Sequence, residues 1–331
     1  MARRRYIALL LGVAWLLAAA DNASAQQPPL ELIDKIPLGP VAGRIDHMAI
    51  DHARHRLFVA EMGNDAVGVV DLEHRALLTQ VAGLDEPQGV AYSAEADTLL
   101  VANGGNGAVI GYHGADYASA DRLDLKDDAD NIRMDPMSGQ AWVGFGSGAL
   151  AAIDPATLRK VSEVSLRGHP EGFQTDPSGK YIFVNVPDDR EIAVVDRASG
   201  RQIDAWKNTD ANGNFPMALA NNGEKVIVVF RNPARVFAIE GNTGVILARE
   251  PTCDDADDVF ADDKRQRIYV SCGSGAIDVF QMKDDEILRM ARIETVAGAR
   301  TSLFDVEMDR LFLAVRSTSR EPAAIWEYQP E

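Results

Sequence analysis

The stretch RLFVA, residues 56–60, decides the fold of this chain because close variants of it return along the sequence. Each variant is short, rich in β-branched and aromatic residues and bounded by turn residues, which is typical of a β-strand. The steps between equivalent residues are 42, 42, 41, 45, 41 and 43. So even a spacing indicates a sevenfold internal repeat. The equivalent residues, which we call the marker residues, are Val59, Val101, Val143, Val184, Val229, Val270 and Leu313.

Each repeat contains three further strand-like segments around the marker strand. A short segment such as HMAID (residues 47–51) comes first, and a turn rich in Asp, Pro, Ser and Gly leads into the marker strand. In most repeats a glycine turn follows, and then a third segment such as VGVVDL (residues 67–72) and a more polar fourth such as RQIDAW (residues 201–206). Four strands in about 42 residues are the signature of a propeller blade. The sequence therefore predicts an all-β, seven-bladed β-propeller with four-stranded blades.

The two ends of the predicted domain, residues 26–331, complement each other. The seventh repeat ends at AIWEYQ, residues 324–329, and lacks a fourth strand. ELIDKIPL, residues 31–38, is strand-like and has no repeat of its own. We expect this N-terminal strand to close the last blade, because ring closure hides strand edges that would otherwise pair with other chains.

The chain resembles the secreted seven-bladed propellers of the YVTN type, the YncE-like group. The resemblance rests on the repeated strand ending near FVA or IYVS, on the turn DPSGK from Asp176, and on the VVD endings at Asp71 and Asp196. It covers nearly the whole of residues 26–331. It implies the propeller fold and a binding or scaffold role without catalysis, although propellers host many activities.

Residues 1–25 have the composition of a secretory signal peptide. Three arginines precede an apolar run of 14 residues, and Ala23-Ser24-Ala25 fits a cleavage site. The alternative is a membrane anchor, but a span needs roughly 20 apolar residues. We expect export to the periplasm or the medium, with no membrane span after cleavage.

The charge and cysteine content narrow the partners. The net charge is −17, and cleavage would remove three Arg and one Asp, which leaves −19. A protein with this negative charge repels nucleic acid, so we expect its partner to be a cationic small ligand or a basic protein segment. We also expect the protein to be a monomer.

Cys253 and Cys272 are the two cysteines of the chain. In an exported protein such a pair suggests a disulfide, and the alternative is two free thiols.

The acidic hexapeptides DDADNI (residues 127–132) and DDADDV (residues 254–259) occupy the same place in repeats three and six. Counting back from the marker residues places polar side chains fifteen and thirteen positions earlier, where the first strand of each blade should line the central channel. Seven carboxylates in these two rows are opposed there by Arg44 and Arg300 alone. The predicted ligand-binding residues are Arg44, Asp46, His47, Glu86, Gln88, Asn131, His169, Glu171, Asn214 and Arg300. The predicted metal-binding residues are Asp128, Asp130, Asp255 and Asp257.

These rows allow more than one function. An oxygen-rich cluster suits Ca²⁺ or Mg²⁺ and added His suits Zn²⁺ or Mn²⁺, so a divalent cation is the cofactor that the sequence suggests. A binding propeller with an acidic channel mouth is the preferred hypothesis, and a metal-dependent hydrolase such as a lactonase is the alternative. An electron-transfer role is disfavoured, since there is no CxxCH motif and only four Trp. Asp and Asn are also favoured in turns, which would explain part of the acidic pattern without a ligand.

Overall fold

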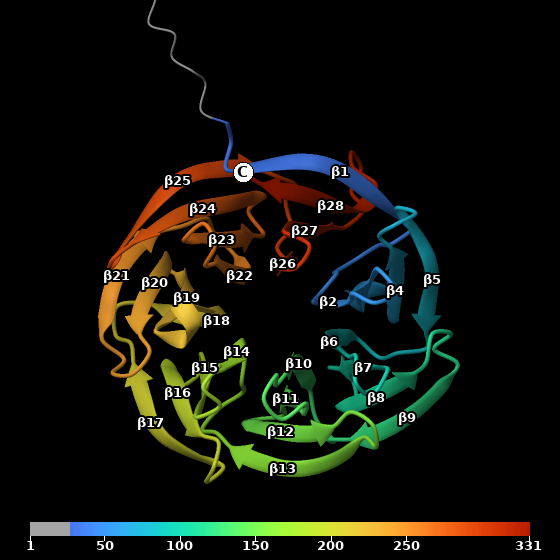
Figure 1. Cartoon of the computed structure of the whole chain (residues 1–331), viewed down its shortest axis with the longest axis horizontal. Coiled ribbons are helices and arrows are strands. Elements are labelled where there is room, and N and C mark those ends of the chain that lie inside the picture. Colours follow the sequence, from blue (N-terminus) through green and yellow to red (C-terminus); the bar gives the residue numbers. More distant parts are fainter. Residues whose placement is uncertain (1–26) are drawn as a thin grey trace, which may run out of the picture.

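The computed structural model describes residues 27–331, and the predicted signal peptide lies outside the described residues. Seven four-stranded antiparallel sheets surround a central channel (Figure 1). The predicted all-β, seven-bladed propeller is thus confirmed. No helix among the described residues is long and apolar enough to cross a membrane.

The blades follow one another along the chain. The first six are formed in order by β2–β5, β6–β9, β10–β13, β14–β17, β18–β21 and β22–β25, and the seventh by β26–β28 with β1. The strands are β1 (Leu30–Gly39), β2 (Met48–Asp51), β3 (Arg56–Glu61), β4 (Ala66–Asp71), β5 (Ala76–Ala82), β6 (Pro87–Ser93), β7 (Thr98–Asn103), β8 (Ala108–His113), β9 (Ser119–Asp124), β10 (Ala129–Met134), β11 (Ala141–Phe145), β12 (Ala149–Asp154), β13 (Arg159–Ser165), β14 (Phe173–Thr175), β15 (Tyr181–Val186), β16 (Glu191–Asp196), β17 (Arg201–Lys207), β18 (Asn212–Ala220), β19 (Lys225–Asn232), β20 (Ala234–Glu240), β21 (Ile246–Pro251), β22 (Ala256–Asp262), β23 (Arg267–Cys272), β24 (Ala276–Lys283), β25 (Glu286–Glu294), β26 (Ser302–Asp305), β27 (Arg310–Val315) and β28 (Ala323–Pro330). Two 3-10 turns complete the list, η1 (Met62–Asn64) and η2 (Asn221–Gly223).

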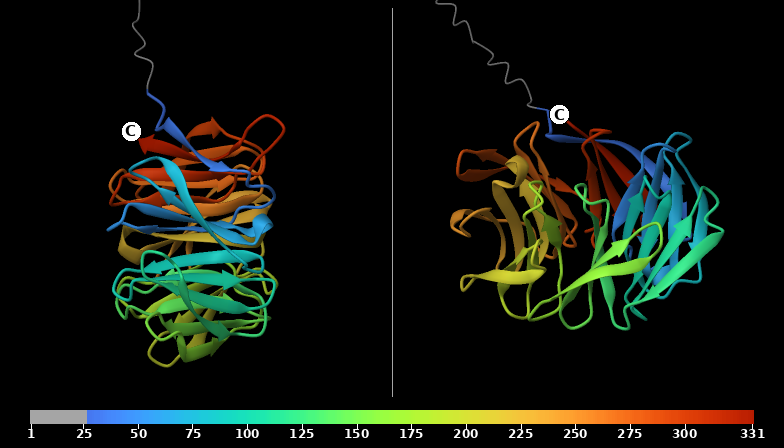
Figure 2. Two further views of the ribbon diagram at one scale, coloured as in Figure 1. Left: turned by 90° about the vertical axis from the view of Figure 1, so that its right-hand side faces the viewer. Right: turned by 60° about the horizontal axis from the view of Figure 1, so that its bottom comes forward.

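The marker residues hold the blades together. Each lies on the second strand of its blade, and all seven are 0% exposed. Apolar clusters fill the spaces between neighbouring blades; one of them joins Tyr269 and Ile277 of blade six to Leu311 and Tyr328 of blade seven. The recurrent run of β-branched and aromatic residues therefore provides the interblade core. Two further views show the blades stacked face to face around the ring (Figure 2).

The N-terminal strand closes the ring as predicted. β1 pairs antiparallel with β28, from Leu30 opposite Pro330 to Gly39 opposite Ala323. Ile36 of β1 is fully buried and belongs to the apolar cluster between blades seven and one. Burial of this side chain adds hydrophobic stabilisation to the backbone hydrogen bonds of the closure.

The first strands of four blades contain a register irregularity close to the predicted site. In blade three the pairing with β11 skips from Ala129 to Ile132, and in blade six the pairing with β23 skips from Ala256 to Asp258. Blades two and five show the same feature. Because a β-bulge changes the direction of the side chains around it, simple alternation along the strand does not decide which residues face the channel.

A candidate ligand site at one mouth of the central channel

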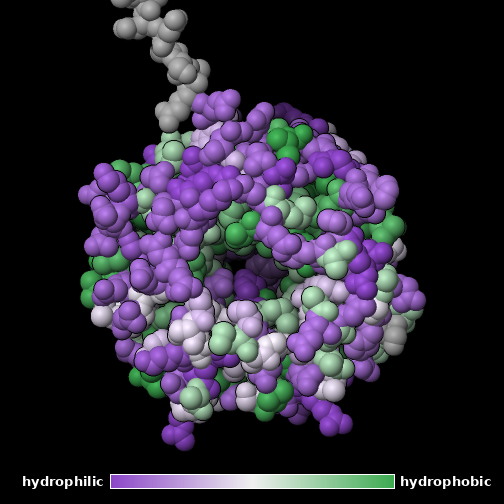
Figure 3. Space-filling view, viewed as in Figure 1, coloured by the Kyte–Doolittle hydropathy of each residue, from purple (hydrophilic) through white to green (hydrophobic). Residues whose placement is uncertain are grey.

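The channel contains a cavity of about 520 Å³ that is lined by the first strands of all seven blades. This volume is within the range of small-molecule sites. Figure 3 shows the opening at the centre of one face, with hydrophilic residues inside it. Of the residues predicted from sequence, those that line the cavity are Arg44, Asp46, His47, Asp130, Asn131, Glu171 and Asp257.

The repeated hexapeptides have a backbone role in each blade. Asp128 and Asp255 occupy equivalent positions with φ of 24° and 59°, and Glu86 of blade two has a φ of 51°. Asp tolerates this left-handed conformation better than most residues. The carbonyl oxygens of Asp128 and Asp255 accept hydrogen bonds from the amides of Gly146 and Gly273 at 3.0 and 2.8 Å. Part of the acidic repeat is therefore explained by the turn that begins each first strand.

In blade six, arginines neutralise the acidic pair. Arg300 lies 2.7 Å from Asp255 and 2.9 Å from Asp257, and Arg44 approaches Asp257 at 3.9 Å. Arg231, at the end of β19, also pairs with Asp257. The expectation that Arg44 and Arg300 alone oppose the acids is thus corrected. Arg231 could have been found by aligning the ends of the marker strands, where it is the one basic residue among the seven repeats.

In blade three, the equivalent acids face a histidine. His169 lies 3.8 Å from both Asp128 and Asp130 and donates its Nδ1 hydrogen to the carbonyl oxygen of Gly146 at 2.6 Å. Asp130 is the main reason that the pKa of His169 rises to about 9, so the imidazole is charged at neutral pH. The two similar hexapeptides are therefore matched by different cations.

Two other carboxyl groups of the mouth are in unfavourable surroundings. Burial, followed by the charge of Asp130, raises the pKa of Glu171 to about 7. Within residues 27–331, Glu171 has no ion-pair partner. Burial also raises the pKa of Asp46 to about 8, although Arg44 lies 2.7 Å away. Both groups thus hold a proton more readily than ordinary acids, because burial removes the water that would stabilise their negative charge.

Below the mouth, the channel contains a neutral histidine, an amide and a cation. His47 lies 3.7 Å from Asp258 and from Asp46, but burial and the charge of Arg133 lower its pKa to about 4. Asn131 is 3% exposed, and its Oδ1 has no hydrogen-bond partner among the described residues. Arg133 lines the same cavity and was not among the residues predicted from sequence.

Five of the predicted ligand-binding residues do not line the cavity, namely Glu86, Gln88, His169, Asn214 and Arg300. Asn214 is fully buried, and its Nδ2 donates to Asn185 Oδ1 at 3.1 Å and to the carbonyl oxygen of Glu191 at 2.9 Å. The prediction for Asn214 is corrected, because the bulge that follows it directs the side chain into the blade. Gln88 lies against the Gly104 turn of blade two, and Glu86 is exposed outside the cavity lining.

The predicted metal ligands do not converge. Among residues 27–331, no group of three or more His, Cys, Asp or Glu side chains is placed to hold a metal ion. The four predicted ligands form two pairs on β10 and β22 or just before them, and these strands lie on different sides of the ring (Figure 1).

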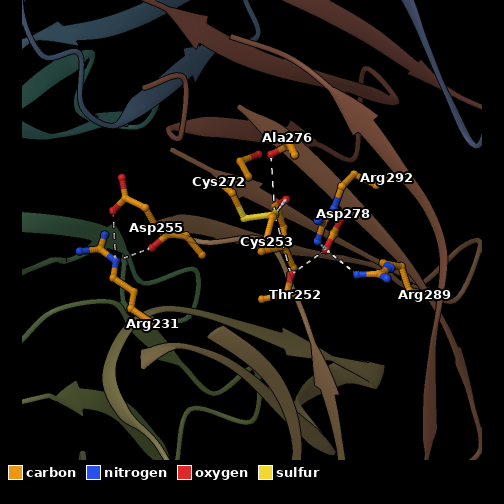
Figure 4. The surroundings of a disulfide bond; sticks show 12 residues. Arg231, Thr252, Cys253, Asp255, Cys272, Ala276, Asp278, Arg289 and Arg292 are labelled. Atoms are coloured by element: carbon orange, nitrogen blue, oxygen red, sulfur yellow. Dashed lines mark hydrogen bonds and ion pairs between the residues drawn. A yellow bond between two sulfur atoms is a disulfide. The ribbon is translucent and has the colours of Figure 1, made fainter. Parts of the chain in front are cut away.

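Cys253 and Cys272 form a disulfide within blade six. Both residues are buried, and the bond lies between the Arg231–Asp255 pair and the buried carboxylate of Asp278 (Figure 4). The disulfide links the segment just before β22 to the end of β23. It therefore anchors the loop that carries Asp255 at the channel mouth.

Comparison with known proteins supports the architecture. No protein-family model and no curated protein matches the chain. A chain of hydrazine synthase from Kuenenia stuttgartiensis is similar in structure, with a TM-score of 0.73 and 18% identity over 85% of this chain and 94% of that one. A chain from the crystal structure of the mitotic checkpoint complex has a TM-score of 0.75 and 13% identity over 98% of this chain and 99% of that one. At these identities the similarity shows the seven-bladed propeller fold.

Proposed function

We propose that this protein is a non-enzymatic binding propeller whose channel mouth takes the cationic group of a small ligand between Glu171 and Asp130. The observation that carries the proposal is Glu171, a carboxylate in the cavity lining without an ion-pair partner among the described residues. The resemblance to YVTN-type propellers supports a binding role. A ligand taken from the periplasm or the medium would agree with the predicted export signal.

The electrostatics of Glu171 favour a cationic ligand. An unpaired, half-buried carboxylate destabilises the protein when it is charged, and its pKa of about 7 reflects this. An ammonium group within hydrogen-bond distance would offset the charge and lower that pKa. Ligand binding near pH 7 should therefore release a proton from Glu171. Asp130 adds a second acceptor, since its only ion-pair contact among the described residues is His169 at 3.8 Å.

The enclosed position of Glu171 favours a small molecule over a protein segment. The group lies inside the cavity with Asp46, Asn131 and Asp257 rather than on the outer face of the ring. A small ammonium ion can enter a cavity of about 520 Å³ with little strain. A basic protein segment would have to insert a long side chain into the channel.

Calorimetric titration with hexylamine at pH 7 tests the proposal. We expect saturable binding with proton release, detected as a heat that depends on the ionisation enthalpy of the buffer. Glu171→Gln should weaken binding roughly tenfold, since a hydrogen bond to a charged group contributes about 1.5–3 kcal/mol. The matched control is Glu73→Gln, because Glu73 is exposed on a turn of blade one.

Three outcomes would overturn the proposal. Equal affinity of the wild type and Glu171→Gln would remove Glu171 from the site. Binding of a lysine-rich peptide but not of hexylamine would indicate a protein partner. Saturable stabilisation by Ca²⁺, Mg²⁺, Mn²⁺ or Zn²⁺ that is lost in Asp128→Asn would instead favour the metal-dependent hydrolase.

A further inference from the structure

Arg133 is a cation inside the channel that has no ion-pair partner among the described residues, and its guanidinium lies 5.9 Å from the centroid of the Phe173 ring. It lies on β10, in a row formed by the equivalent residue of each first strand, and it is the one charged member of that row. The row consists of Ala49, Ala91, Arg133, Gln174, Leu219, Phe260 and Leu303, all of which line the cavity.

The guanidinium of Arg133 has unused hydrogen-bond donors. Its Nη1 donates to the carbonyl oxygen of Ile132 at 2.8 Å, which is its one hydrogen bond among residues 27–331. Asp258 and Asp130 attract it electrostatically, but neither forms an ion pair with it. Burial lowers the pKa of Arg133, which means that the channel does not fully replace the water lost by the charge.

We propose that the ligand is amphoteric: its cationic group binds Glu171 and Asp130, and a carboxylate at its other end binds Arg133. This inference rests on the proposed function and specifies the chemical class of the ligand. A planar guanidinium matches a carboxylate through two parallel hydrogen bonds. A phosphate with two charges is disfavoured, because Asp130 and Asp258 lie near enough to repel the second charge.

The spacing of the two subsites sets the length of the ligand. Asp130 and Arg133 are three residues apart on β10 and both line the cavity, so the two subsites lie at different points along the same strand. An α-amino acid, whose charges are adjacent, is too short to meet both. In an ω-amino acid or a short peptide, the amino and carboxylate groups are far enough apart to meet both subsites. The apolar side chains of Met48, Leu219 and Phe260 line the cavity and can contact the middle part of such a ligand.

Asn131 is a second, independent indication of a ligand. Asn131 lies on β10 between the two subsites and is only 3% exposed. Its Oδ1 has no hydrogen-bond partner among the described residues. A buried acceptor without a hydrogen bond is destabilising. A peptide N–H in the middle of the ligand would satisfy it, so triglycine should bind more tightly than 6-aminohexanoate.

The test compares 6-aminohexanoate, hexylamine and hexanoate by calorimetry on the same protein. The wild type should bind 6-aminohexanoate at least tenfold more tightly than hexylamine. Arg133→Gln should abolish that difference. Arg159→Gln is the matched control, because Arg159 is exposed on the outer strand β13.

The outcomes separate this inference from the proposed function. If hexylamine binds through Glu171 but 6-aminohexanoate binds no better, the amphoteric ligand is overturned and the cation site stands. If neither binds, both fail. If Arg133→Gln does not fold, the ratio of the wild-type affinities for 6-aminohexanoate and hexylamine still tests the amphoteric ligand. Arg133→Lys provides a second variant, which keeps the positive charge but loses the planar guanidinium.

Discussion

His169 of blade four lies 3.8 Å from Asp130 of blade three, so that a charged imidazole spans the boundary between two blades at the channel mouth. Asp130 raises the pKa of this histidine to about 9 from its ordinary 6.5. Other acids also face it, namely Asp128 and Glu171. The pair therefore links the charge of the mouth to the packing of neighbouring blades.

The stability of the protein should depend on this histidine at alkaline pH. A raised folded-state pKa gives stability that is fully present below about pH 6.5 and is lost as the pH rises through about 9. We expect the unfolding free energy of the wild type to fall between pH 6.5 and 9.5 by roughly 1–3 kcal/mol more than that of His169→Gln. Urea unfolding across this range measures it, with His74→Gln, at an exposed histidine, as the control. Parallel pH profiles for wild type and His169→Gln would contradict the assignment.

The closing strand offers a matched pair of substitutions. Ile36 and Ile33 lie on the same strand, but Ile36 is 0% exposed and Ile33 is 44% exposed. Ile36→Ala should lower the unfolding free energy by about 2–5 kcal/mol, because it leaves a cavity in the core between blades seven and one. Ile33→Ala should change it by less than about 1 kcal/mol. Chemical denaturation decides, and similar losses for both variants would mean that the closure depends on backbone pairing rather than on buried side chains.

The disulfide of blade six should stabilise the folded protein. The sequence separation of 19 residues corresponds to a stabilisation of about 3 kcal/mol through restriction of the unfolded chain. We therefore expect dithiothreitol to shift the equilibrium denaturation midpoint of the wild type downward. Cys253→Ser with Cys272→Ser should unfold at the lower midpoint with or without the reductant. An unchanged wild-type midpoint, with both thiols shown to be reduced, would contradict this expectation.

The sequence was sufficient for the fold because the repeat acts through local rules. The marker residues are separated by regular intervals, and each is buried in an equivalent position. The closure was predictable for the same reason, since one strand was missing at one end and one was unassigned at the other. Because the repeats share one pattern, the strands assigned in one blade support the strands assigned in the others.

The site was only partly predictable because it depends on bulges and on long side chains. Asp130, Glu171 and Asp257 line the cavity as the alignment suggested, but the bulge after Asn214 buries that side chain in the blade. Arg231 reaches Asp257 from a different strand, which no count of first-strand residues includes. Neither the direction of a bulged residue nor the reach of an arginine follows from the period of the repeat.

The pairing of Leu30 with Pro330 brings together residues 300 positions apart in the chain. On a ribosome, β28 is synthesised after the other strands of the ring, so β1 has to remain without its partner until those strands have emerged. Contacts of such large sequence separation slow folding, because chain entropy must be lost before they form. The six consecutive blades can each assemble from neighbouring residues, whereas the seventh needs both ends. We therefore expect ring closure to be the slow step of folding, during which the unpaired edge of β1 must be kept from pairing with other chains.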